Sequence, residues 1–134
     1  MSYRHNLQAL LFAGLTLAST ALLAHTKLES VVPADGAALR EAPQVLELGF
    51  SDEVQLLKLD LATEAGVAQD MDFTPVATAA KTFSVPLPAL GPESYVVNWT
   101  IVGADGHRIE GKTSFLVDPV AHEPADVQGD DSGR

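Results

Sequence analysis

The chain has 134 residues, contains no cysteine, and carries 18 acidic against 8 basic residues, for a formal net charge of −10. This length suits one domain with a single modest core. The acidic balance argues against nucleic acid or an anionic lipid surface as the partner, because both need a basic face. The lack of cysteine excludes disulfides and thiolate metal ligands, so the core alone must hold the fold together.

Residues 1–24 have the layout of a cleaved secretory signal peptide. Arg4 supplies the single charge before Lys27, and an apolar run from Leu7 to Leu23 follows it and closes on small residues. The run is shorter than the roughly 20 apolar residues of a transmembrane helix, and glycine and polar residues interrupt it. We therefore expect an exported protein.

Two cleavage sites compete at the end of this segment. Ser19 and Ala21 fit the small-x-small rule well. Cleavage after Ala24 fits it less well, because Leu22 then stands at the outer recognition position. Cleavage after Ala24 would instead make His25 the first residue of the mature chain. We prefer that site for the chemical reason given below.

The rest of the chain is dominated by apolar and polar residues that alternate with a period of two, a pattern typical of half-buried β-strands. The expected strands cover residues 46–50, 57–61, 83–87, 94–102 and 109–117. Glycine and proline turn signals separate them, which predicts an all-β sandwich or Greek-key barrel for the domain at 25–117. Residues 118–134 offer little to bury, and we expect them to form a disordered acidic tail.

The histidines narrow the search for a functional site. Of the four, His5 lies in the signal segment and His122 in the tail, so the domain itself holds only His25 and His107. No nucleophile motif accompanies either of them, and the chain has no glycine-rich phosphate loop. Metal binding is therefore the main candidate.

A histidine at the N-terminus can bind one metal ion through two nitrogen atoms, because its α-amine and ring Nδ1 close a six-membered chelate. The amine must lose its proton, a small cost near neutral pH since its reference pKa is about 7.7–8.0. Asp105 and His107 can add a carboxylate oxygen and an imidazole, since residues i and i+2 of an extended chain share a face. This nitrogen-rich set suits Cu(II) better than zinc.

The simplest interpretation of Asp105-Gly106 is a hairpin turn between the two longest expected strands, with His107 beside it on the surface. A turn and a ligand-bearing loop are compatible, because loops at the end of a sandwich commonly carry functional side chains on a rigid frame. The motif Asp-x-His is weak when taken alone.

Three stretches closely resemble the CopC family of periplasmic copper-resistance proteins: HTKLESVVPADG at 25–36, LELGFSD at 46–52 and YVVNWTIVGADGH at 95–107, with Gly111 beyond them. The resemblance runs from His25 to about Val117. It implies an immunoglobulin-like Greek-key β-barrel of about seven strands in the periplasm. It also implies that Cu(II) is held by the following residues: His25 through its amine and ring, Asp105, and His107.

The same resemblance bears on two other residues. Asp52 stands where the family commonly has an acidic residue near the copper, so it is either an outer, weak ligand or an ordinary surface aspartate. Some members also bind Cu(I) through a methionine-rich loop, whereas the matching region 62–79 contains Met71 alone. Because one thioether cannot build that site, we expect one Cu(II) site and no Cu(I) site.

The expected function is that of a monomeric, non-enzymatic copper carrier that delivers its ion to an inner-membrane protein of the CopD type. Two other functions stay open. A copper-brace oxidative enzyme, as in polysaccharide monooxygenases, would use the same histidines but needs a broad polymer-binding face, and only 6% of the residues are aromatic. A metal-free immunoglobulin-like interaction module would explain the strands, but not why His25 occurs together with Asp105 and His107.

Overall fold

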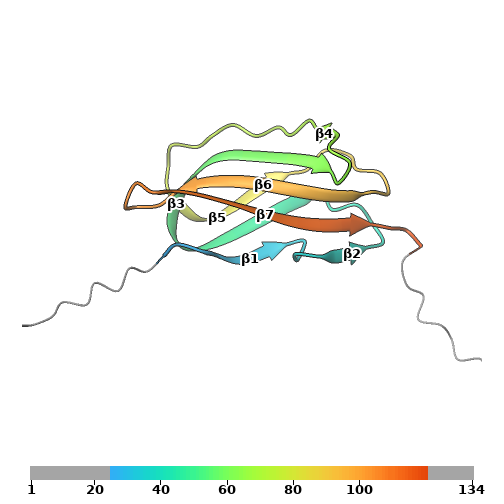
Figure 1. Cartoon of the computed structure of the whole chain (residues 1–134), viewed down its shortest axis with the longest axis horizontal. Helices are drawn as coiled ribbons and strands as arrows, with labels where there is room; N and C mark the ends of the chain where they lie inside the picture. The colour runs from blue at the N-terminus through green and yellow to red at the C-terminus, as the bar shows by residue number, and fades with distance from the viewer. Residues whose placement is uncertain (1–24, 121–134) are drawn as a thin grey trace, which may run out of the picture.

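The computed structural model describes residues 25–120, where the chain forms seven β-strands (Figure 1). They are β1 Leu28–Val32, β2 Ala37–Leu39, β3 Val45–Thr63, β4 Ala68–Gln69, β5 Ala80–Pro86, β6 Ser94–Val102 and β7 Arg108–Val117. The expected all-β fold with about seven strands is confirmed. The expected signal segment and nearly all of the expected tail lie outside the described residues. Within 25–120, no helix has the length and apolarity needed to cross a membrane.

The sheet runs in the order β1-β3-β6-β7-β2, with β4 and β5 also paired to β3. All pairs are antiparallel except β2 with β7. The first half of β3 pairs with β1 and β5, and its second half pairs with β6 and β4. This one strand of 19 residues therefore passes from one layer of the fold to the other (Figure 1).

The sequence predicted two strands, at 46–50 and 57–61, where the structure has the single strand β3. The register between β3 and β6 shifts between Leu56 and Lys58, so Leu57 is an extra residue on β3. An extra residue reverses which side chains face inward. The buried hydrophobic side chains are accordingly even-numbered before it and odd-numbered after it: Leu46, Leu48, Phe50, Val54, Leu56, Leu59 and Leu61. Leu57 itself is only half-buried, although the alternation grouped it with Leu59 and Leu61.

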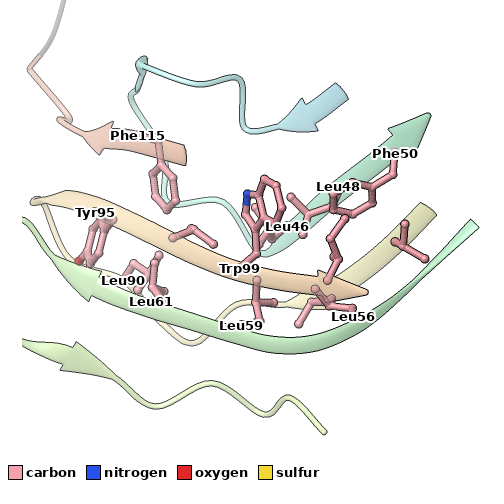
Figure 2. Close-up of a cluster of buried hydrophobic side chains, with 14 of the residues drawn as sticks. Leu46, Leu48, Phe50, Leu56, Leu59, Leu61, Leu90, Tyr95, Trp99 and Phe115 are labelled. Carbon is pink, nitrogen blue, oxygen red and sulfur yellow. The ribbon is translucent and has the colours of Figure 1, made fainter. Parts of the chain in front are cut away.

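The core fills the space between the two layers (Figure 2). One face of β6 is buried as the alternation predicted, and it includes Tyr95 and Trp99. The ring of Trp99 meets Phe50 edge-on at 5.3 Å between centroids, and Tyr95 stacks on Phe115 at 5.4 Å. Met71 is half-buried and packs against this core, as expected for a methionine used in packing.

Candidate metal centre

The hairpin loop between β6 and β7, residues 103–107, carries two of the expected ligands, Asp105 and His107. The amide of Gly106 donates to the carbonyl oxygen of Gly103 at 3.0 Å. The amide of Gly103 donates to the carbonyl oxygen of His107 at 3.1 Å. Gly106 has a φ of +78°, a left-handed conformation that favours glycine. The expected turn at Asp105-Gly106 is confirmed.

Asp105 and His107 are held together by two contacts. The backbone amide of His107 donates to Asp105 Oδ1 at 3.0 Å, and the ring Nδ1 of His107 lies 2.8 Å from Asp105 Oδ2. The backbone hydrogen bond from His107, followed by the ring contact, lowers the pKa of the Asp105 carboxyl below its ordinary value. The side chains stay 79% exposed for His107 and 59% exposed for Asp105. Both can therefore still be reached by an ion from solution.

The first described residues of the chain lie beside this loop. Gly103 is buried at the end of β6, and a Cβ atom placed on it would lie 3.0 Å from Asp105 Oδ1 and 3.4 Å from Thr26 Oγ1. Thr26 and Asp105 therefore approach each other over a residue that has no side chain. Because His25 directly precedes Thr26, it starts within one residue of the loop.

Two hydrogen bonds fix this N-terminal segment to β3. The amide of Lys27 donates to Ser51 Oγ at 3.0 Å, and the amide of Ser51 donates to the carbonyl oxygen of Lys27 at 2.9 Å. Ser51 Oγ in turn lies 3.4 Å from Oδ2 of Asp52, to which it donates. Lys27 is thus fastened to the residue that precedes Asp52.

An open hollow of about 440 Å³ joins these pieces of chain. It is lined by Thr26, Asp52, Glu53, Lys81, Ala104 and Asp105. Asp52 is half-buried and shares this hollow with Asp105, which supports a place for Asp52 near the site. Glu53 and Lys81 were not predicted from the sequence as part of the site. Neither belongs to a motif or a spacing pattern, and only the pairing of β5 with β3 places Lys81 here.

The expected ligands are gathered at one end of the sandwich without forming a finished metal site. Among residues 25–120, no three histidine, aspartate or glutamate side chains are grouped so that they could hold a metal ion. Only Asp105 and His107 touch. His25 is exposed, and its nitrogen is bonded to Ala24 in the uncleaved chain. A site that uses all of them requires cleavage before His25. His25 and Thr26 must then turn toward the loop.

Comparisons with known proteins agree on one family. A family model described as the CopC domain matches residues 28–118. Copper resistance protein C of Pseudomonas syringae pv. tomato is 32% identical over 116 residues, which cover 80% of this chain and 91% of that protein. Protein YobA of Escherichia coli strain K12 is 29% identical over 106 residues, which cover 76% and 86%.

Solved structures show the same fold. CopC from Methylosinus trichosporium OB3b aligns with a TM-score of 0.60 at 24% identity, covering 73% of this chain and 98% of that one. The copper resistance protein PcoC from Escherichia coli, in its selenomethionine form, aligns with a TM-score of 0.56 at 24% identity, covering 69% and 99%. Because the sequence identity is only 24%, these two structural alignments show a shared β-sandwich fold and nothing more.

Proposed function

The chain belongs to the CopC family of copper resistance proteins, for which copper binding is implied, and from this premise we propose that its mature form binds one Cu(II) ion. The proposed ligands are the α-amine and ring Nδ1 of His25, a carboxylate oxygen of Asp105 and the ring of His107. Asp52 is proposed as an outer, weak ligand.

The observation that carries this proposal is the approach of Thr26 and Asp105 over Gly103. Residues that are far apart in sequence meet at one end of the sandwich, and one of them is the neighbour of His25. A two-residue reach from the anchor at Lys27 is enough for the amine and ring of His25 to approach the loop. The proposal needs no rearrangement of the strands.

The proposed nitrogen and oxygen ligands suit a Cu(II) ion. Amine and imidazole nitrogens are ligands that Cu(II) prefers, and Cu(II) heads the affinity order of the divalent first-row metals at such sites. The hydrogen bonds from His107 lower the pKa of the Asp105 carboxyl and so favour its ionised form, which is the form that offers oxygen to a cation. The amine and imidazoles must give up protons to bind the ion, so copper affinity should fall as the solution is acidified.

We also propose that the protein is exported to the periplasm, is monomeric, and carries copper rather than transforming a substrate. The apolar segment before His25 supports export. Asp105 and His107 are exposed, so the ligands of a partner protein can reach an ion that they hold. This supports delivery of copper to a partner, which we take to be an inner-membrane copper transporter of the CopD type.

Titration of the mature protein that begins at His25 tests the site. We expect one equivalent of Cu(II) to bind, with the electron paramagnetic resonance spectrum of tetragonal copper bound to several nitrogen atoms. His107→Ala should weaken binding strongly, whereas His122→Ala, a histidine outside the domain, should not. A protein that binds no stoichiometric copper would remove the proposal.

A second variant tests the amine. Adding one alanine before His25 keeps every side chain but moves the α-amine out of the six-membered chelate. We expect a large loss of affinity and a spectrum with fewer nitrogen ligands. An unchanged affinity would show that the amine of His25 is not a ligand.

A further inference from the structure

Lys81 is the one basic residue that lines the hollow shared by Asp52 and Asp105. It lies near the start of β5, between Ala80, which pairs with Val54, and Thr82, which pairs with Gly49. The regular pairing of β5 with β3 is interrupted between these two points. Lys81 therefore lies opposite the irregular stretch of β3 that carries Asp52 and Glu53.

The charges that line this hollow have a simple balance. Asp52 and Glu53 come from β3, Asp105 comes from the β6–β7 loop, and Thr26 and Ala104 are neutral. Three carboxylates and one ammonium group carry a formal charge of −2. A single divalent ion therefore neutralises the hollow, whereas without Lys81 a negative charge would remain.

We propose that Lys81 sets the copper affinity of the site through its charge, keeping the affinity below the value that the carboxylates alone would give. This inference rests on the copper site proposed above. A carrier must release its ion to a partner, and a fixed positive charge beside the ion raises the rate of release without taking up a ligand position. Lys81 acts here as a tuning residue and not as a ligand.

The effect should be modest and sensitive to salt. Lys81 is exposed and its ammonium group is strongly hydrated, so it acts on the ion across solvent rather than by direct contact. For a single charge near a divalent ion in such a medium, we expect a change of roughly three- to tenfold in the dissociation constant. Added salt should screen most of it, because the Debye length falls to about 3 Å at 1 M.

The test compares Cu(II) dissociation constants, measured by competition with a chromophoric chelator, for the mature protein and three variants. Lys81→Gln should bind Cu(II) three- to tenfold more tightly at low salt, and the difference should shrink at high salt. Lys81→Arg keeps the charge and should behave as the unaltered protein does. Lys112→Gln removes a lysine that lines a different hollow, beside Asp35, and should change the constant by less than twofold.

The outcomes separate this inference from the proposed function. If the unaltered protein binds no copper, the proposed function fails and this inference falls with it. If it binds copper and Lys81→Gln binds equally or more weakly, only the role of Lys81 is refuted. A tighter Lys81→Gln variant whose advantage does not change with salt would also refute it, because a charge effect in an open hollow must be screened.

Discussion

Gly111 on β7 is the position where adding a single methyl group is expected to lower the stability of the fold most clearly. Gly111 pairs with Trp99 across β6 and β7, and a Cβ atom placed on it would lie only 2.1, 2.5 and 2.6 Å from Cζ2, Cη2 and Cε2 of the indole. The ring has little room to move, since Trp99 is 7% exposed and meets Phe50 edge-on. Gly111→Ala must therefore displace the ring or the strand.

We expect Gly111→Ala to lower the free energy of unfolding by about 1–3 kcal/mol, the usual range for overpacking a filled core. Chemical denaturation measures this, and the fluorescence of Trp99 reports on it directly because the chain has one tryptophan. Gly49→Ala is the matched control. Its Cβ would approach Ser30 Oγ at 2.2 Å, but a hydroxyl group can rotate away, so the loss should be smaller.

A double-mutant cycle tests the cause. Phenylalanine lacks the outer ring atoms Cζ2 and Cη2 of the indole, so Gly111→Ala should cost clearly less when Trp99 is already replaced by Phe. Equal costs in both backgrounds would refute the contact as the cause. A Gly111→Ala protein as stable as the unaltered one would refute the packing argument altogether.

Three further predictions concern the loop, the opposite end of the sandwich and the methionine. Gly103→Ala should weaken Cu(II) binding by about tenfold, measured by chelator competition, because its Cβ would press on Asp105 at 3.0 Å; unchanged binding would contradict the geometry. The Asp35 carboxylate accepts hydrogen bonds from the Ser114 amide and the Thr113 hydroxyl, which lower its pKa, so its stabilisation is present above the ordinary carboxyl pKa and is lost as pH falls through the lowered value. Denaturation of Asp35→Asn at several pH values should show a weaker loss on acidification than in the unaltered protein. Met71→Leu should leave copper binding unchanged and alter stability by less than about 1.5 kcal/mol, as for a packing residue. Cu(I) binding by the unaltered protein that the variant lacks would contradict this.

The local part of the site could be predicted from the sequence because its residues are neighbours along the chain. Asp105 and His107 are separated by one glycine, and the turn that this glycine permits is enough to bring ring and carboxylate together. The place of His25 was inferred from metal chemistry and from a family resemblance. Its position beside the loop depends on Thr26 lying close to the open side of Gly103, which no local pattern encodes.

The strands also differ in how completely they could be predicted from the sequence. β6 was predicted in full because apolar residues recur at every second position from Tyr95 to Ile101. β3 was predicted as two strands because the extra residue at Leu57 reverses the alternation without ending the strand. β1, β2 and β4 were not predicted, since strands of two to five residues with mixed exposure carry too short a pattern and form only by pairing with longer strands.

Alternation and turn chemistry act over a few residues, so the fold class, the strands β6 and β7 and the closeness of Asp105 and His107 could all be predicted from the sequence. Which distant segments share an end of the sandwich follows only from how the strands pair in three dimensions. The pairings of β3 with β1 and with β5 bring Thr26, Asp52 and Lys81 around one hollow, and those pairings follow from burying a common core. The charge that surrounds the proposed copper ion is therefore a property of the fold.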